Sequence, residues 1–247
     1  MPEFLTTSSG RRIAYEKSTG DAPGIVFLGG FVSDMQGSKA AHLEAWARAQ
    51  GRAFLRFDYS GHGQSSGDFS DGCIGDWVQD AVAVINGVTD GKQVLVGSSM
   101  GGWISLILAA EIPDKISGII GISTAADFTE DGFWDGFSEN QRQDLHKLGQ
   151  VAIPSEYDEP YIITRRLIED GRRHLVLRRP LPLPFPVRLL HGSDDTSVKL
   201  SVPLHILAHA SGDDIRLTLV KGADHSFSTP DCLALIESAV QQVIDRA

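Results

Sequence analysis

Six consecutive residues, Gly-Ser-Ser-Met-Gly-Gly at positions 97–102, constrain the fold of this chain more than any other stretch. An apolar run typical of a buried strand precedes them at 93–96, and a run of helical composition follows at 103–110. A serine on a sharp strand-to-helix turn leaves room only for small neighbours, and a glycine stands two positions to either side of Ser99. The pattern predicts a nucleophile elbow, in which the helix directs its free N–H groups at the serine oxygen.

Two residues downstream supply the chemistry that such a serine needs. A strand-like run at 187–190 is followed by Asp195, and a carboxylate just beyond the end of a strand is well placed to hold an imidazole. Asp194 is the alternative acid, by adjacency alone. The final strand-like run, at 215–220, leads to His225. We expect Ser99 to be the nucleophile, His225 the base and Asp195 the acid that orients the base.

Strand-like and helix-like runs alternate along most of the chain. The strand-like runs lie at 24–28, 53–58, 93–96, 115–122, 187–190 and 215–220, and the helix-like runs at 36–49, 71–86, 103–110 and 231–245. Two short extended runs, at 4–8 and 11–17, flank a Ser-Gly pair and predict a hairpin. We predict an α/β fold with a mostly parallel central sheet, an N-terminal hairpin and helices on both faces.

The strand-like run at 24–28 ends in Gly29, Gly30 and Phe31. Glycines just past a central strand allow the backbone to approach a ligand closely. The N–H group of Phe31 is therefore a candidate donor to the oxyanion that forms during acyl transfer; the alternative is an ordinary strand-to-helix turn. The glycine-rich loop at 59–67 is not a dinucleotide loop, because Ser66 stands where the third glycine is needed. His62 in that loop is interpreted as a loop residue rather than a base.

The alternation of strands and helices breaks between 124 and 186. This segment contains no convincing buried strand, but it has a proline cluster between 180 and 186 and the aromatic residues Phe128, Phe133, Trp134 and Phe137. We predict a mainly helical lid inserted into the fold; the alternative is a helical subdomain that only completes the core. Phe133, Trp134 and Phe137 are candidates for substrate binding.

Six of the chain's 22 basic residues cluster in the same segment, namely Arg165, Arg166, Arg172, Arg173, Arg178 and Arg179. A solvated helix face is the ordinary interpretation of such a charge run. The alternative is that one or two of these arginines face the mouth of the site and pair with an anionic leaving group, such as a glucuronide carboxylate. Arg165 and Arg166 are the candidates for that role.

Length and composition fit a single domain over residues 1–247, since 42% of the residues are hydrophobic. A net charge of −10 argues against nucleic acid or an anionic membrane as a partner. Cys73 and Cys232 are too few and too far apart for a disulfide framework, which fits a reducing compartment.

The uncharged run at 94–110 is too short for a membrane span. No signal peptide and no metal-binding or phosphate-binding motif is visible. We expect a cytoplasmic protein without a metal site.

Across nearly its whole length the chain resembles the α/β-hydrolase family. The motifs that carry the resemblance are Gly-x-Ser-x-Gly at 97–101, Asp58-x-x-Gly61-x-Gly63-x-Ser65, His191-Gly192-x-x-Asp195-x-x-Val198 and Gly222-Ala223-Asp224-His225-Ser226. Stretches at 29–40, 57–61, 96–103 and 188–192 are similar to those of the abhydrolase-domain-10 group. Members of that group are described as acyl-protein thioesterases (S-depalmitoylases) and acyl-glucuronide esterases.

The resemblance implies that Ser99, Asp195 and His225 form a catalytic triad and that the N–H groups of Phe31 and Met100 form an oxyanion hole. Two departures from the group stand out. A lysine, Lys199, replaces the proline that usually follows the acid motif, but the acid itself is in place. No counterpart of the mitochondrial targeting segment of eukaryotic members precedes the first predicted strand, so a bacterial-type cytoplasmic protein is expected.

We expect a serine hydrolase that cleaves carboxylic esters or thioesters through an acyl-enzyme, with a small molecule or an acylated protein as substrate. Such a mechanism needs no cofactor, because the serine supplies the chemistry. A serine at the elbow argues against the dehalogenases and epoxide hydrolases of the same fold, which use an aspartate there. C–C bond hydrolysis, peptidase activity and cofactor-free haloperoxidase activity are alternatives, and so is a catalytically silent binding protein.

Overall fold

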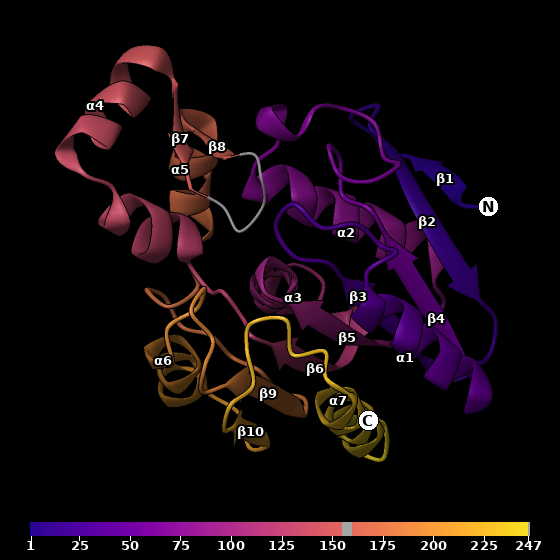
Figure 1. Cartoon of the computed structure of the whole chain (residues 1–247). Helices are drawn as coiled ribbons and strands as arrows, with labels where there is room; N and C mark the ends of the chain where they lie inside the picture. Colours follow the sequence, from indigo (N-terminus) through magenta and orange to yellow (C-terminus); the bar gives the residue numbers. More distant parts are fainter. Residues whose placement is uncertain (155–159, 247) are drawn as a thin grey trace.

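An eight-stranded sheet is the centre of the computed structural model, which describes residues 1–154 and 160–246. Its strands are β1 Glu3–Thr6, β2 Arg12–Ser18, β3 Asp21–Leu28, β4 Arg52–Phe57, β5 Gln93–Ser98, β6 Ile116–Ile122, β9 Val187–Gly192 and β10 Ile215–Val220. They lie in the order β1-β2-β4-β3-β5-β6-β9-β10 (Figure 1). β2 runs antiparallel to β1 and to β4, and every other neighbouring pair is parallel. The predicted N-terminal hairpin and mostly parallel sheet are therefore confirmed.

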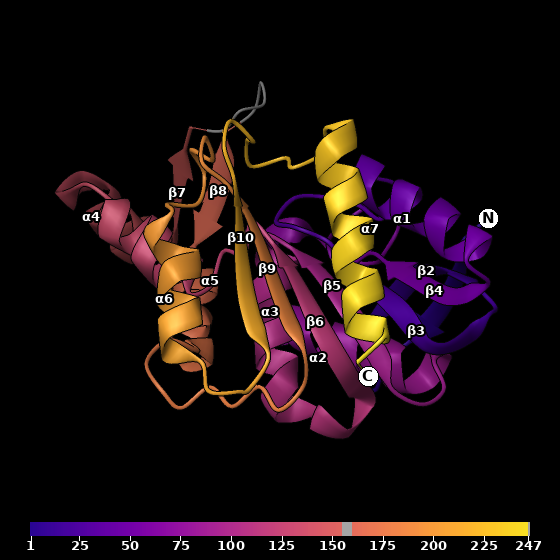
Figure 2. The ribbon, with the colours of Figure 1, turned by 90° about the horizontal axis from the view of Figure 1, so that it is seen from below.

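Helices cover both faces of the sheet and enclose two hydrophobic cores. Successive residues of a strand point to opposite faces, so Ile25 and Phe27 of β3 enter one core and Val26 and Leu28 the other. The helices α1 Ser38–Ala49 and α7 Pro230–Ile244 cover the first face, and α2 Ile74–Val88 and α3 Met100–Glu111 cover the second (Figure 2). Burial on both faces explains why the central parallel strands β5 and β6 are apolar along most of their length.

One further helix, α6 Ser201–His209, was not predicted from the sequence. It contains no charged residue, and Pro203 lies in its first turn. Leu204 and Leu207 are exposed while Ile206 is buried, so the helix lacks the contrast between an apolar and a charged face on which a sequence-based prediction depends.

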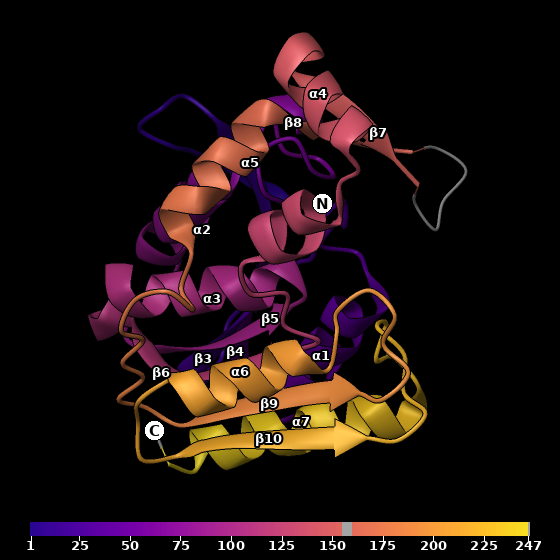
Figure 3. The ribbon, with the colours of Figure 1, turned by 90° about the vertical axis from the view of Figure 1, so that its left-hand side faces the viewer.

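The segment between β6 and β9, which we call the insertion (residues 124–186), builds a layer of its own beside α2 and α3 (Figure 3). Its elements are a π-helical turn at Thr129–Trp134, α4 Glu139–Leu148, β7 Gln150–Ile153, β8 Tyr161–Thr164, α5 Arg165–Gly171 and a 3₁₀ turn at Arg172–His174; residues 155–159 lie outside the described chain. The insertion is mainly helical, as predicted. The expectation that it contains no buried strand is wrong, because β7 and β8 pair antiparallel and bury Val151 and Ile163. Strands of four residues are too short to show a reliable alternation.

A single carboxylate joins the two ends of the insertion. The Asp127 side chain is fully buried at the start of the segment, and it accepts hydrogen bonds from the backbone N–H groups of Val176 (2.8 Å) and Leu177 (3.1 Å) near its end. The Arg178 guanidinium lies 2.8 Å from the same carboxylate. Because a buried charge needs partners of this kind, Asp127 holds the two ends of the insertion together.

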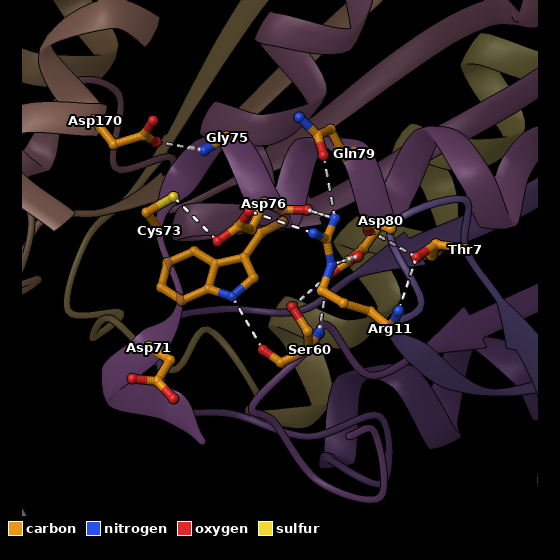
Figure 4. Close-up of polar contacts among 12 residues, drawn as sticks. Thr7, Arg11, Ser60, Asp71, Cys73, Gly75, Asp76, Gln79, Asp80 and Asp170 are labelled. Atoms are coloured by element: carbon orange, nitrogen blue, oxygen red, sulfur yellow. Dashed lines mark hydrogen bonds and ion pairs between the residues drawn. The ribbon is translucent and has the colours of Figure 1, made fainter. Parts of the chain in front are cut away.

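The insertion also docks on the N-terminus of α2. The Asp170 carboxylate accepts a hydrogen bond of 2.6 Å from the Gly75 N–H group, where the free donors of a helix favour a negative charge (Figure 4). Arg166 forms an ion pair of 2.7 Å with Asp76. The neighbouring Cys73 thiol lies 3.3 Å from the Asp76 carboxylate. Burial, as the largest cause, raises the pKa of the Cys73 thiol to about 12. Cys73 and Cys232 are both buried and free.

Candidate active site

Ser99 occupies a strained position between β5 and α3. Its backbone has φ +54° and ψ −115°, a conformation that is rare for residues other than glycine. Backbone hydrogen bonds to the neighbouring strand and to the loop after it hold the residue there. The Ser99 N–H donates to the Ile122 carbonyl of β6 at 2.8 Å, and the Ser99 carbonyl accepts from Ala125 at 3.1 Å. The side chain therefore projects alone from the carboxyl end of the central strand, which is the geometry that the elbow motif predicts.

The two glycines of the motif are required by backbone contacts. A Cβ on Gly97 would lie 2.3 Å from the carbonyl oxygen of Gly101, across the elbow. A Cβ on Gly101 would lie 2.1 Å from the carbonyl oxygen of Leu28, at the end of β3. Real β-carbons do not approach backbone atoms so closely, so neither position accepts a side chain without a shift of the main chain. This close packing brings α3 and the loop after β3 together around Ser99.

A hydrogen-bonded chain connects Ser99 to His225 and Asp195. The His225 Nε2 atom lies 3.1 Å from the Ser99 Oγ, and its Nδ1 atom lies 2.9 Å from the Asp195 Oδ2. The three residues follow β5, β10 and β9, whose carboxyl ends meet at one edge of the parallel sheet. The structure thus brings together the three residues that the sequence singled out.

The two adjacent aspartates have different environments. The Asp195 side chain is fully buried, and its Oδ1 atom accepts from the N–H groups of Ser197 (2.9 Å) and Val198 (2.8 Å). Burial alone would raise the pKa of Asp195, but the hydrogen bonds from His225 and from Val198 outweigh it and keep the pKa below its usual value. Asp194 is exposed and bonds to the Ser193 hydroxyl at 2.8 Å. Only Asp195 reaches the imidazole.

Backbone contacts also fix the loop that carries His225. A Cβ on Gly192 would lie 2.0 Å from the Ala223 carbonyl, so the loops after β9 and β10 pack main chain against main chain. The Asp224 carboxylate accepts from the Phe227 N–H at 3.1 Å, and the Lys39 ammonium donates to the Ser226 carbonyl at 2.5 Å. The sequence gives no sign of these roles of Lys39 and Phe227, because no local pattern signals a contact between residues 187 positions apart.

The loop after β3 and the start of α3 both adjoin Ser99. A Cβ on Gly30 would lie only 3.5 Å from the Ser99 Cβ, so the loop after β3 passes directly beside the serine. The Gly30 carbonyl accepts from the Ser33 N–H (3.3 Å) and hydroxyl (3.0 Å), and in a planar trans peptide the following N–H, that of Phe31, points the opposite way. Met100 is the first residue of α3, where N–H groups have no partner within the helix.

Aromatic rings gather next to this loop. The Phe31 ring makes edge contacts with rings of the insertion, among them Phe133, whose centroid lies 5.7 Å away. Phe137 stacks on Phe133 at 6.5 Å and is buried. Trp134 instead packs against Phe137, His146 and Arg172. Of the three aromatic candidates for substrate binding, Phe133 is thus the one in contact with the loop beside Ser99.

Five of the six clustered arginines are engaged with carboxylates. Arg166 pairs with Asp76 at 2.7 Å, and Arg165 lies 3.8 Å from Glu169 on the same helix. The other ion pairs join Arg172 to Glu130, Arg173 to Asp170, and Arg178 to both Asp127 and Asp131. This pairing favours the ordinary interpretation of the charge run, because a neutralised guanidinium attracts a distant anion less.

His62 is a loop residue, as interpreted from the sequence, but it is buried. Its Nδ1 atom lies 3.1 Å from the Ser60 carbonyl, and its ring packs against Phe69 and Trp77 at 5.1 Å. Burial lowers the pKa of His62, although the Ser60 carbonyl and the Asp80 carboxylate act in the opposite direction.

Within residues 1–154 and 160–246, no group of three His, Cys, Asp or Glu side chains is arranged to hold a metal ion.

The sequence and the fold of this chain are similar to those of known proteins. Residues 25–158 match the family described as alpha/beta hydrolase fold. The mouse palmitoyl-protein thioesterase ABHD10, mitochondrial, is 34% identical over 245 residues, which are 98% of this chain and 82% of that protein. The structure of mouse alpha/beta hydrolase domain-containing protein 10 covers 99% of this chain and 98% of its own, with a TM-score of 0.91 and 33% identity. A putative hydrolase from Agrobacterium vitis S4 has a TM-score of 0.95 and 36% identity, with the same coverage.

These comparisons correct one expectation and identify the family. The expected cytoplasmic location is wrong, because the ABHD10 relatives from mouse, human and other mammals are mitochondrial proteins. None of the helices in the described ranges is both long enough and apolar enough to cross a membrane. The ABHD10 relatives are palmitoyl-protein thioesterases, and thioesterases are hydrolases that cleave acyl thioesters. The chain belongs to the α/β-hydrolase fold family, in the abhydrolase-domain-10 group.

Proposed function

We propose that this protein is a serine hydrolase that cleaves acyl thioesters, and esters of the same acids, through an acyl-enzyme on Ser99. The hydrogen-bonded chain from Asp195 through His225 to Ser99 carries the proposal. Long-chain acyl proteins are the proposed substrate class, because the relatives that match over almost the whole chain are palmitoyl-protein thioesterases.

The protonation state of each group supports a direction for the first proton transfer. The lowered pKa of Asp195 means that its carboxylate is ionised at neutral pH and can only accept hydrogen bonds. The Nδ1 atom of His225 must therefore carry the proton, which leaves the lone pair of Nε2 to face the Ser99 hydroxyl. In this tautomer the imidazole takes the proton as Ser99 Oγ attacks the thioester carbonyl, and it then delivers the proton to the leaving thiol.

Attack on the carbonyl creates a tetrahedral oxyanion that needs donors. The N–H groups of Phe31 and Met100 are the proposed pair, because one lies on the loop that passes beside Ser99 and the other at the free N-terminus of α3. Water then repeats the attack on the acyl-enzyme, with His225 again as the base. We propose that the insertion is a lid whose aromatic face, including Phe133, receives the acyl chain.

A pair of variants and a probe test this function. Ser99→Ala keeps a small side chain at the elbow but removes the nucleophile, so the folded variant is expected to lose both hydrolysis of an S-palmitoyl peptide and labelling by a fluorophosphonate probe. Ser98→Ala is the matched control, because Ser98 is the neighbouring residue at the end of β5 and has no partner in the proposed chain. Substantial turnover by a well-folded Ser99→Ala variant would overturn the proposal. A protein that neither labels nor hydrolyses any ester would instead be a binding protein of the same fold.

A further inference from the structure

One ring of the insertion touches both elements that carry the proposed oxyanion donors. Phe128 packs edge-on against Phe31, with ring centroids 5.5 Å apart, and edge-on against Trp103, with centroids 5.4 Å apart. Phe31 lies on the loop after β3, and Trp103 lies in the first turn of α3, which begins at Met100. We propose that Phe128 is a positioning residue that sets the separation and orientation of the two oxyanion N–H groups. This inference rests on the proposed function.

The loop that carries the Phe31 N–H is held at its two ends, where the Gly29 backbone packs against α3 and the Met35 N–H donates to the Asp58 carboxylate at 2.6 Å, and between these points the Phe31 ring is its main side-chain anchor. It begins with Gly29 and Gly30, which restrict the backbone less than any other residue type. Val32 follows with φ +57° and an exposed side chain, so the turn is strained and gains little from burial at that position. Among the described residues, the hydrogen bonds across the turn are those from Ser33 to the Gly30 carbonyl. The position of the N–H therefore depends on where the ring is anchored.

Within the described residues, the Phe31 ring is anchored by five aromatic neighbours from two parts of the chain. Phe69 (4.9 Å) and Trp77 (6.1 Å) belong to the segment between β4 and the middle of α2. The other three belong to the insertion, and they are Phe128 (5.5 Å), Phe133 (5.7 Å) and Tyr161 (5.7 Å). Edge-to-face contacts of this kind are directional, so the five rings define one orientation of Phe31.

Phe128 differs from the other neighbours in two ways. It is the one insertion ring in the described chain whose contacts include both Phe31 and Trp103, the latter being fully buried on α3. Its backbone is also fixed, because the preceding residue is Asp127, whose buried carboxylate is bonded to Val176 and Leu177. The Phe128 ring, whose backbone is fixed by Asp127, packs between the loop after β3 and α3. It therefore keeps these two elements at a constant distance.

The competing interpretation is that Phe128 only contacts the acyl chain of the substrate. The two roles differ in how they depend on chain length. A contact with the acyl chain matters for a long acyl group and not for acetate, and its loss raises KM. A misplaced oxyanion donor slows the chemical step for every acyl group, so its loss lowers kcat for acetate and octanoate alike.

The test is to measure kcat and KM of Phe128→Ala with p-nitrophenyl acetate and p-nitrophenyl octanoate, together with inhibition by a trifluoromethyl ketone, whose adduct places an oxyanion in the same hole. We expect kcat to fall by about tenfold to a hundredfold for both esters, which is part of the ~10²–10³-fold loss that follows complete removal of an oxyanion donor. Ketone affinity should fall in parallel, and KM for the acetate should stay nearly constant. Phe128→Leu, which keeps most of the bulk, should recover a large part of kcat.

Phe185→Ala is the matched control. Phe185 is a partly buried aromatic residue at the other end of the insertion that packs on the same core, and the ring pairs of the described chain include none between Phe185 and Phe31. It should change kcat for the acetate less than twofold. If Phe128→Ala does not fold, Phe128→Leu decides the question through the same comparison of acetate with octanoate. Loss confined to the octanoate, or equal loss in Phe185→Ala, would overturn the positioning role while wild-type activity persists. Failure of the proposed function itself would appear differently, as absence of activity in the wild type.

Discussion

Gly101 and Leu28 pack against each other so closely that a β-carbon on Gly101 would stand 2.1 Å from the Leu28 carbonyl oxygen. This contact joins the start of α3, where Met100 carries one proposed oxyanion donor, to the end of β3. The loop that follows β3 carries the other proposed donor, the Phe31 N–H group. The second glycine of the elbow is thus required by a neighbouring strand as well as by the turn in which Ser99 lies.

We expect Gly101→Ala to lose most of the esterase activity and to lower the free energy of unfolding by about 1–3 kcal/mol or more, because an extra carbon in a well-packed site forces the backbone apart. Gly136→Ala is the control, since no atom lies within 4 Å of the added carbon there. Urea unfolding and turnover of p-nitrophenyl acetate check the prediction. A Gly101→Ala protein as stable and as active as Gly136→Ala would contradict the packing that we describe.

The two adjacent aspartates provide a matched pair for the acid. Asp195→Asn removes the charge that orients and stabilises the imidazole, and we expect it to lower kcat on the order of 10⁴-fold. Asp194→Asn changes an exposed carboxylate that bonds only to Ser193 among the described residues, so we expect a change of less than twofold. The measurement is kcat at saturating ester for both variants. Similar losses in the two variants would mean that Asp195 is not the orienting acid.

The protein should become less stable as the pH falls below neutrality, because His62 is buried in its neutral form. Its folded-state pKa is lowered, chiefly by burial, so below the ordinary histidine value of about 6.5 the unfolded chain binds a proton that the folded chain does not. The free energy of unfolding then decreases as the pH falls from about 6.5 towards the folded-state pKa, by at most about 1.4 kcal/mol per pH unit for this group. Urea unfolding of the wild type and of His62→Asn between pH 7.5 and pH 5.5 should give a shallower slope for the variant. His205→Asn, at an exposed position, should leave the slope unchanged; equal slopes in all three proteins would exclude His62 as a cause.

The arginines of the insertion should not discriminate between anionic and neutral leaving groups. Arg166 is paired with Asp76 and Arg165 lies near Glu169, so the double variant Arg165→Gln/Arg166→Gln removes charges that are already balanced. We expect kcat/KM for an acyl glucuronide and for a neutral ester of the same acid to change by the same factor. A selective loss of about 1.5–3 kcal/mol in transition-state terms for the glucuronide would instead show a charge-assisted contact with the substrate.

The parts of this fold that follow from the sequence are those with strong local patterns. β3, β5 and β6 are apolar along most of their length because helices cover both of their faces, and the runs at 24–28, 93–96 and 115–122 predicted them within three residues at each end. Chain order and strand ends were enough to nominate Ser99, Asp195 and His225, which the structure brings within hydrogen-bond distance. Their catalytic roles are the proposal made above.

The parts that do not follow from the sequence depend on contacts between distant residues. β7 and β8 are four residues each, and only their pairing with each other buries Val151 and Ile163. No pattern near Asp127 indicates that its carboxylate binds the backbone about fifty positions later. The sequence favours Asp195 over Asp194, but the contact that separates the two residues, the inward turn of the Asp195 side chain towards the imidazole, is visible only in the structure.

The central claim is that Ser99 becomes acylated during turnover. We would mix the protein with an S-palmitoyl peptide, quench it in acid within the first turnovers, and locate the added acyl mass by mass spectrometry of proteolytic peptides. If Ser99 is the nucleophile, a palmitoyl adduct will appear on the peptide that contains Ser99, will disappear on longer incubation as water completes the cycle, and will be absent from Ser99→Ala. Turnover with no adduct on that peptide, or an adduct on another residue that Ser99→Ala retains, would show that Ser99 is not the acylated residue.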